Sequence, residues 1–237
     1  MRLDKFVADA AQLTRSAARA LIAQGRVTVN GQVCRKADCA LKEGDSVCAG
    51  GKPLGREEYV YIMLNKPAGV VSASADGRDK TVVDLVGGAF PRRQLFPAGR
   101  LDKASTGFVL LTDDGAFAHG ILAPKRHVPK TYRVVLDAPV TGEMVKAFAA
   151  GVTLADGQRM QPAQLIPDEA DPFAATVVLR QGVYHQIKRM FGVLGAGVNG
   201  LHRTAIGGLA LDKGLAPGAW RLITPEEKSL LQAGGEG

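Results

Sequence analysis

One aspartate, Asp102, lies in a segment where a carboxylate could act on a substrate. It belongs to the polar, glycine-flanked loop Gly99-Arg100-Leu101-Asp102, and an apolar strand pattern at 108–111 follows shortly after. A rigid sheet often presents catalytic groups on the loops that it holds in place. Taken alone, however, an aspartate in such a loop more often caps a turn, with Arg100 as a surface charge. Whether Asp102 has a catalytic role therefore has to be judged from the residues that accompany it.

Two other segments carry residue types that could work with a carboxylate. Tyr132 stands near the start of a predicted strand, where its ring could stack on a base or its hydroxyl could exchange a proton. A half-buried strand tyrosine is the alternative. His185, Lys188 and Arg189 are three and four residues apart and share one face of a predicted helix. A cation there could neutralise a carboxylate or bind phosphate, although a solvated basic face would give the same pattern.

The sequence lacks the patterns of nucleotide cofactor and metal sites. It contains no GxxxxGK[ST] loop, and no GxGxxG opens a helix after a strand. Cys34, Cys39 and Cys48 lack the close pairing of zinc ligands, so we expect reduced core cysteines. No apolar run is long enough to span a bilayer, and the start of the chain lacks a signal core. We therefore expect a cytoplasmic protein with no cofactor, no metal and no membrane partner.

Positive charge is concentrated at the start of the chain. The 237 residues have a formal net charge of +7, and residues 1–56 hold ten basic and five acidic side chains. This asymmetry predicts a separate module that binds an anionic partner such as RNA. The basic residues that we expect to contact RNA from this module are Arg2, Lys5, Arg15, Arg19 and Arg26.

The elements that must position these residues form two domains. Residues 1–50 are predicted to fold as helix, helix and hairpin, because Thr14 precedes a helical apolar stripe and Asn30-Gly31 is a strong hairpin turn. Residues 51–58 contain glycine, proline and charge without an apolar pattern, which indicates a linker. Residues 59–237 form the second domain.

The second domain is predicted to be α+β, with a mixed, largely antiparallel sheet flanked by helices, because several strands follow one another without an intervening helix. The predicted strands are 59–64, 107–112, 130–137, 160–166, 174–181 and 201–211. The predicted helices are 81–86, 115–122, 142–150, 185–195 and 225–232.

Taken together, the segments resemble the RsuA-type family of pseudouridine synthases over nearly the whole chain. The matching motifs, in order, are YIMLNKPAG (61–69), GRLDKASTG (99–107), KTY (130–132), GVYHQIKRMF (182–191) and LHRTAIGG (201–208). Residues 1–50 resemble the S-four RNA-binding domain of ribosomal proteins. Five motifs in the same order are far more specific than any one of them.

The resemblance implies a role for each motif residue. Asp102 would be the essential carboxylate, Lys188 its partner cation, and Tyr132 the residue that stacks on the base and exchanges a proton later in the reaction. Arg100 would hold the extracted nucleotide or its neighbouring phosphate. Further RNA contacts are implied for Lys66, Lys130, His185, Gln186, Arg189 and Arg203.

The implied activity is the isomerisation of a uridine to pseudouridine in bacterial ribosomal RNA, by a monomer that needs no cofactor. The motifs are closest to the branch that modifies uridine-516 of small-subunit 16S RNA. Large-subunit 23S RNA is an open alternative, as is a non-catalytic RNA-binding or ribosome-assembly protein on the same scaffold. An aspartate-based nuclease or glycosidase would need a metal cluster or a second placed carboxylate, and neither is evident. The partner is either free ribosomal RNA or a partly assembled ribosomal subunit.

Overall fold

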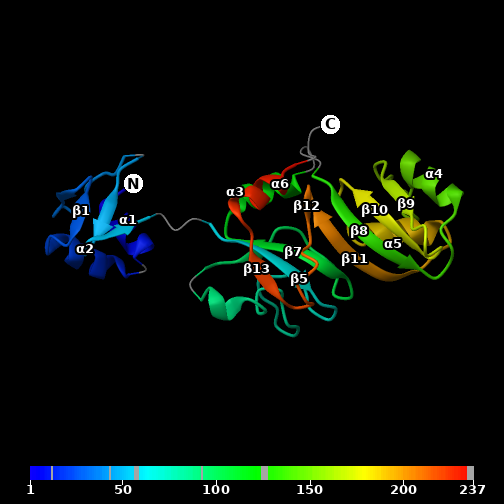
Figure 1. Ribbon diagram of the computed structural model, residues 1–237, viewed down its shortest axis with the longest axis horizontal. Helices are drawn as coiled ribbons and strands as arrows, with labels where there is room; N and C mark the ends of the chain where they lie inside the picture. Colours follow the sequence, from blue (N-terminus) through cyan, green and yellow to red (C-terminus); the bar gives the residue numbers. More distant parts are fainter. Residues whose placement is uncertain (12, 43, 56–58, 92, 124–127, 234–237) are drawn as a thin grey trace. The chain divides into compact units, whose positions relative to one another are not determined.

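The chain folds into two compact units, Met1–Tyr59 and Val60–Gly237. The computed structural model, drawn along the chain in Figure 1, describes residues 1–11, 13–42, 44–55, 59–91, 93–123 and 128–233. Within these described residues, no helix is long and apolar enough to cross a membrane.

The first unit packs two helices on a small antiparallel sheet. Its helices are α1 (Leu3–Ala10) and α2 (Arg15–Ala23), and its strands, in the sheet order β2-β1-β3-β4, are β1 (Val27–Val29), β2 (Gln32–Val33), β3 (Val47–Ala49) and β4 (Lys52–Leu54). Thr14 caps α2, because its side chain accepts a hydrogen bond from the backbone N–H of Ala17. Asn30 and Gly31 both have positive φ, as a two-residue hairpin turn requires. The predicted helix–helix–hairpin order is confirmed.

The segment that was expected to be a linker is partly a strand. Lys52–Leu54 forms β4, which pairs with β3 across a turn at Gly50 and Gly51, both with positive φ. The prediction of a linker at 51–58 is wrong for these residues, because a three-residue edge strand with exposed side chains has no apolar pattern to reveal it. Residues 56–58 lie outside the described part of the chain.

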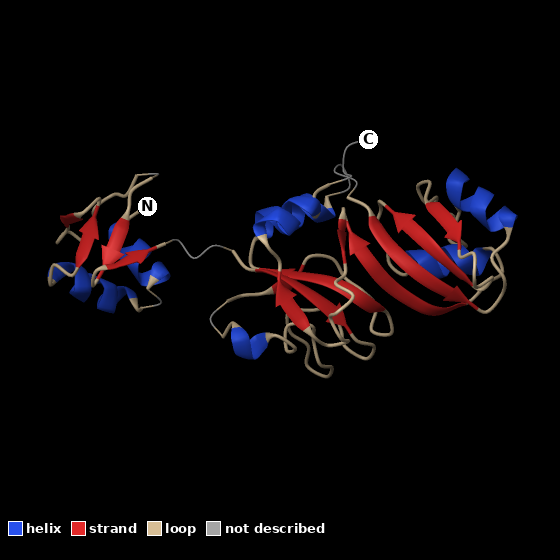
Figure 2. Cartoon of the chain, in the orientation of Figure 1, coloured by secondary structure: helices blue, strands red, loops and turns tan. Residues whose placement is uncertain are grey.

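The second unit is built on one mixed sheet, which Figure 2 shows as the long red layer of this unit. The sheet order is β13-β5-β7-β11-β8-β10-β9, with β6 paired to β7 and β12 paired to β11. Among the strand pairs of the described residues, β7–β11 is parallel and the others are antiparallel. The strands are β5 (Tyr61–Lys66), β6 (Phe96–Pro97), β7 (Thr106–Thr112), β8 (Lys130–Leu136), β9 (Gln164–Pro167), β10 (Ala174–Leu179), β11 (Val198–Ile206), β12 (Leu209–Ala210) and β13 (Trp220–Leu222). The predicted α+β class with a mixed, largely antiparallel sheet is confirmed.

Hydrophobic cores lie on both faces of the central strands. Along β5, Tyr61 and Met63 belong to one cluster and Ile62 and Leu64 to another, as the two-residue period of a strand requires. The first cluster is covered by α3 (Gly115–Leu122) and the C-terminal α6 (Pro225–Leu230), and the second by the connection between β5 and β7. A third cluster, between β8–β10 and the helices α4 (Gly142–Ala150) and α5 (Gln186–Val193), fills the other half of the sheet.

One predicted helix does not form. Residues 81–86 make hydrogen-bonded turns that lead into a short 3₁₀ helix, Gly87–Ala89. Thr81 and Asp84 cap each other, each side chain accepting from the other's backbone N–H, and Val82 and Val86 are buried against the sheet. The two glycines at 87 and 88 favour leaving the helix, so the segment stops after one turn.

Candidate active site

Asp102 lies in a loop between β6 and β7 that is held from several sides. The side chain of Ser72 accepts a hydrogen bond from Leu101 N and donates one to Leu101 O, each 3.0 Å long. Leu101 itself is buried in the cluster over β5 and β7. On the other side of Asp102, the carbonyl of Lys103 accepts a hydrogen bond from Gly69 N at 2.8 Å. The backbone on both sides of the carboxylate is therefore fixed.

A buried lysine also anchors this loop. The ammonium of Lys66, at the end of β5, donates to the carbonyl oxygens of Pro67 at 3.0 Å, Lys103 at 3.2 Å and Ser105 at 2.7 Å. Its side chain is fully buried. Burial lowers the pKa of Lys66 to about 8, against the opposing effect of the Asp102 charge. Two of the three carbonyls follow Asp102 within three residues, so Lys66 holds the backbone of the loop that carries the carboxylate.

Two side chains from the start of α5 contact the Asp102 carboxylate. Nε2 of His185 lies 3.3 Å from Oδ1, and Nζ of Lys188 lies 3.6 Å from Oδ2. The two residues are three apart, which places them on one helix face. The exposed fractions of the three side chains are 26% for Asp102, 32% for Lys188 and 35% for His185, so the group is half-buried and remains open to a substrate. The predicted pairing of Asp102 with Lys188 is present in the structure.

Tyr132 lies on β8 directly opposite Arg203 of β11. The guanidinium carbon of Arg203 is 5.9 Å from the centroid of the tyrosine ring, a cation–π distance. Tyr132 also packs against the cluster that contains Leu101, the residue before Asp102. The tyrosine is half-buried and keeps part of its ring accessible.

Three residues that were expected to contact RNA are instead buried. Lys66 anchors the loop that carries Asp102, as described. The Nε atom of Arg203 donates to the carbonyl of Phe108 at 2.6 Å, and its side chain is only 2% exposed because β11 pairs beside β7. Gln186 is 4% exposed and accepts a hydrogen bond from the backbone N–H of Val183. These three side chains pack beneath the surface of the site, and their predicted RNA contacts stay predictions.

The other predicted RNA contacts in this unit differ in exposure. Arg100 is exposed, two residues from the carboxylate. Arg189 is half-buried and pairs with Asp156. Lys130 donates to the carbonyl of Ile121, and burial together with the charge of Arg203 lowers the pKa of Lys130 to about 8.

In the first unit, three of the predicted RNA-binding arginines converge on one aspartate. Asp4 is fully buried and accepts hydrogen bonds from Arg2 at 3.2 Å, Arg15 at 3.3 Å and Arg19 at 2.9 Å. Burial raises the pKa of Asp4, but the hydrogen bonds from the three arginines outweigh it and hold the pKa well below its usual range. The arginine side chains are themselves about half exposed.

The buried carboxylate of Asp4 thus holds the guanidinium groups of Arg2, Arg15 and Arg19 close together. The remaining predicted contacts of this unit, Lys5 and Arg26, are exposed. The role of Asp4 was not predicted, although its position between Arg2 and Lys5, with two further arginines at helical spacing, was a usable signal.

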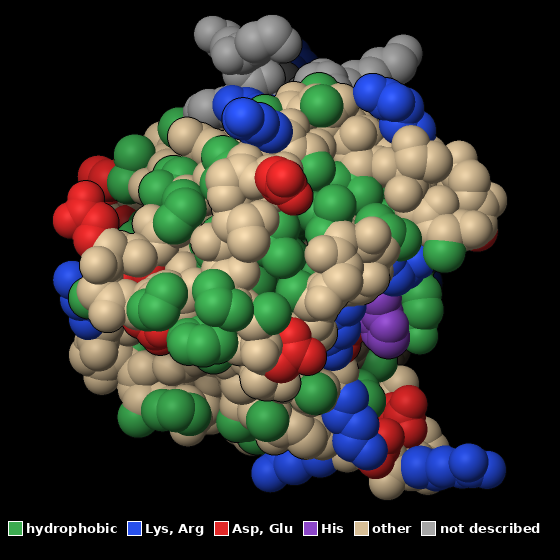
Figure 3. Space-filling model, turned by 90° about the vertical axis from the view of Figure 1, so that its right-hand side faces the viewer, with side chains coloured by type: hydrophobic (Ala, Val, Ile, Leu, Met, Phe, Trp, Pro, Cys, Tyr) green, Lys and Arg blue, Asp and Glu red, His purple; other side chains and the backbone are tan. Residues whose placement is uncertain are grey.

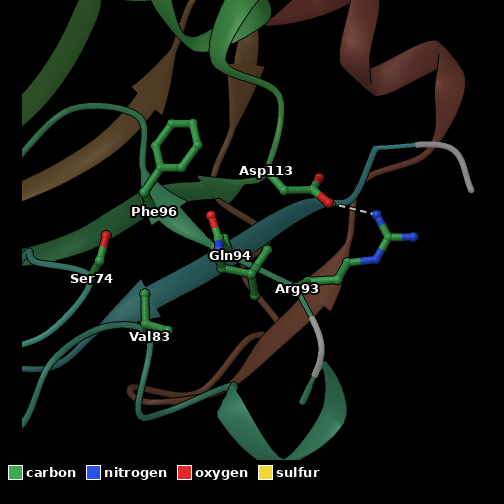
Figure 4. A pocket seen from close by; sticks show the side chains of 7 residues that line it. Ser74, Val83, Arg93, Gln94, Phe96 and Asp113 are labelled. Carbon is green, nitrogen blue, oxygen red and sulfur yellow. Dashed lines mark hydrogen bonds and ion pairs between the residues drawn. The ribbon is translucent and has the colours of Figure 1, made fainter. Parts of the chain in front are cut away.

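A separate hollow of about 540 Å³ lies at the other end of β7 and does not include Asp102 (Figure 4). Val83, Leu95 and Phe96 contribute to its wall. The ion pair between Arg93 and Asp113, 2.6 Å long, lies at its margin. Among the residues that the structure describes, no group of three or more His, Cys, Asp or Glu side chains is placed to hold a metal ion.

Comparison with known proteins agrees with this geometry. A family model described as RNA pseudouridylate synthase matches residues 60–192, which include Asp102, Tyr132 and Lys188, and an S4 domain model matches residues 1–47. The chain is 41% identical to ribosomal small subunit pseudouridine synthase A of Escherichia coli (strain K12), over 96% of this chain and 98% of that protein.

Two further comparisons cover almost the full length. The chain is 38% identical to an uncharacterized RNA pseudouridine synthase, YtzG, of Bacillus subtilis (strain 168), over 98% of each protein. A crystal structure described as that of a pseudouridylate synthase matches with a TM-score of 0.69 at 38% identity, covering 98% of this chain and 99% of that one.

Proposed function

The chain belongs to the RNA pseudouridylate synthase family, and on that premise we propose that it converts one uridine of small-subunit ribosomal RNA, the uridine-516 type site of 16S RNA, to pseudouridine. The observation that supports an active enzyme is the contact set of Asp102, with one carboxylate oxygen near His185 and the other near Lys188. The choice of RNA is supported by relatives, 41% identical, that are named for the small subunit.

The reaction rearranges one nucleotide without a net change in composition. The bond between C1′ of the ribose and N1 of the uracil breaks, the base turns, and C1′ joins C5. The proton on C5 leaves and N1 gains one, so the product is an isomer of the substrate. Such a step requires a carboxylate that is ionised and close to the sugar or base, and Asp102 supplies it.

Other residues of the site bind the nucleotide and transfer the proton. Lys188 places its positive charge 3.6 Å from one oxygen of the carboxylate. The ring of Tyr132 stacks on the uracil, and its hydroxyl takes part in the late proton transfer. Arg100, exposed beside the loop, holds a phosphate of the extracted nucleotide. Extracting a uridine from its stack costs a few kcal/mol, which these stacking and phosphate contacts offset.

The first unit serves as the RNA-docking module. Its three arginines are already oriented by Asp4, which reduces the entropy that they lose on binding phosphates. Lys5 and Arg26 add exposed positive charge. In this proposal the protein acts as a monomer in the cytoplasm, on free RNA or on a partly assembled ribosomal subunit.

The proposal is tested with RNA that carries tritium at C5 of its uridines, since the reaction releases this hydrogen. The purified protein is incubated separately with 16S transcript, 23S transcript and a partly assembled small-subunit particle. We expect tritium release from the 16S transcript or the particle and none from 23S RNA. Release from 23S RNA alone would favour the large-subunit alternative. Binding without release from any of the three would favour a non-catalytic assembly factor.

A further inference from the structure

Tyr184 is an exposed aromatic residue beside the carboxylate, and no role has yet been assigned to it. Its side chain is 75% exposed, the highest value among the large hydrophobic residues of the described chain that lie on the surface. Its ring is stacked on the imidazole of His185, with centroids 3.8 Å apart and planes 15° from parallel. One ring face is therefore covered by His185, and the exposure of the side chain leaves the other face to solvent.

The backbone that carries Tyr184 is held in an uncommon conformation. His185 has φ 50° and ψ 30°, the left-handed region that a residue with a Cβ rarely adopts. Non-glycine residues in this region cluster at functional sites, where the surrounding structure holds them. Here the buried Gln186 does so, since its side-chain oxygen accepts from Val183 N and its side-chain nitrogen donates to Gln181. Ile187 then anchors the following helix in the core.

His185 links Tyr184 to the carboxylate. Asp102 contacts the edge of the His185 ring, and Tyr184 covers that ring's face. Tyr184 therefore belongs to the surroundings of the carboxylate through its contact with His185.

We propose that the open face of Tyr184 is a stacking platform for a nucleobase adjacent to the uridine that reacts at Asp102. Stacking on an aromatic face does not depend on which base is present, so the platform would hold the strand without reading its sequence. Two basic residues of the same site suit a phosphate backbone, since Lys188 is only half-buried beside Asp102 and Arg100 is exposed two residues before Asp102. Figure 3 shows basic side chains beside a histidine at one edge of this face of the molecule.

This inference rests on the proposed function, because it names a further contact to the same RNA. It predicts that loss of the Tyr184 ring changes KM and not kcat. Removing the aromatic ring weakens the hold on RNA, and so raises KM, while the carboxylate and its partners remain and kcat changes little. A tyrosine that merely supported His185 and Asp102 would give the opposite result, a lower kcat at unchanged KM.

The test compares Tyr184→Leu and Tyr184→Phe with the wild-type protein, using tritium release from 16S transcript. Phe173→Leu serves as the matched control, since Phe173 is 41% exposed and lies between β9 and β10 in the same unit. We expect Tyr184→Leu to raise KM by roughly 5- to 150-fold, the range expected for loss of one stacked base, and Tyr184→Phe and Phe173→Leu to stay within about twofold of wild type. A wild-type KM for Tyr184→Leu, an equal loss in Tyr184→Phe, or a loss confined to kcat would each overturn the proposal.

A second readout does not depend on catalysis. Tyr184→Trp places an indole at the platform, and its fluorescence should be quenched by 16S transcript when a base stacks on it. Phe173→Trp is the matched control, because both variants retain Trp220. Equal quenching of the two variants would contradict the proposal that a base stacks at position 184. If the wild-type protein released no tritium but Tyr184→Trp were still selectively quenched, the catalytic proposal would fail while the stacking site remained.

Discussion

Lys66→Met tests how the fold positions the catalytic carboxylate. Methionine approximates the shape of the lysine stem but cannot donate to the carbonyls of Pro67, Lys103 and Ser105. The loop that carries Asp102 then loses its anchor on the side of β5. Because the Ser72 contacts to Leu101 remain, the loop should shift rather than unfold.

The expected effect on stability is small because two contributions oppose each other. A pKa of about 8 in place of 10.5 means that burying the Lys66 ammonium costs up to about 3 kcal/mol at neutral pH, and methionine removes this cost. Against this, the buried carbonyl of Ser105 is left unpaired, at about 1–3 kcal/mol, and the two partly buried carbonyls lose about 1 kcal/mol each. We therefore expect the free energy of unfolding to fall by no more than about 2 kcal/mol.

The expected effect on catalysis is large. A displacement of about 1 Å in a reacting group can reduce the rate by about 10²-fold. Urea unfolding followed by circular dichroism measures the stability, and single-turnover tritium release measures the rate. Lys146→Met, which removes an exposed lysine on α4, is the control and should change neither. A Lys66→Met enzyme that turns over within about threefold of wild type would refute the anchoring role of Lys66.

Three further predictions concern other parts of the molecule. Gly107→Ala should lower the free energy of unfolding by at least about 3 kcal/mol, since φ is +101° and a Cβ would lie 2.3 Å from the carbonyl oxygen of Arg203; a loss below about 1 kcal/mol in urea would contradict this. Lys188→Met should slow single-turnover tritium release by about 10²-fold or more, since a charge 3.6 Å from Asp102 is worth about 5 kcal/mol at a dielectric of 20 before solvent screening; a rate within threefold of wild type would disprove it. Asp4→Asn should weaken binding of 16S transcript by about 10-fold, as the arginines lose their shared anchor; unchanged affinity in filter binding would count against the docking role.

Local patterns predicted a basic helix face at His185, Lys188 and Arg189, but only the family resemblance implied that Lys188 pairs with Asp102. The contact of His185 with the carboxylate was missed, because His185 was expected to contact RNA. The side of the helix that faces the site also follows from its apolar stripe. Burial was harder to predict, because it depends on strands that are far apart in the chain. Arg203 is covered only because β11 lies parallel to β7, roughly a hundred residues earlier.

The sequence did not reveal the elements whose structure depends on a partner strand or on core packing. The strand Trp220–Leu222 pairs with β5 at the sheet edge and is only three residues long, too short for a two-residue period to be recognised. Lys52–Leu54 is equally short. The apolar pattern at 81–86 was helical in spacing, yet the tertiary packing of Val82 and Val86 needs only a turn. In each case the partner strand or core, and not the local propensity, decides the structure.

The most direct test of the account is a map of pseudouridine in cells. The protein is expressed in a bacterial strain that lacks its own copy of the enzyme, beside an Asp102→Asn variant of equal abundance, and pseudouridine is mapped at single-nucleotide resolution in both ribosomal RNAs. We expect one new pseudouridine in 16S RNA with the wild-type protein and none with Asp102→Asn. Modification that persists in the Asp102→Asn strain, or no new pseudouridine with the wild-type protein, would contradict it.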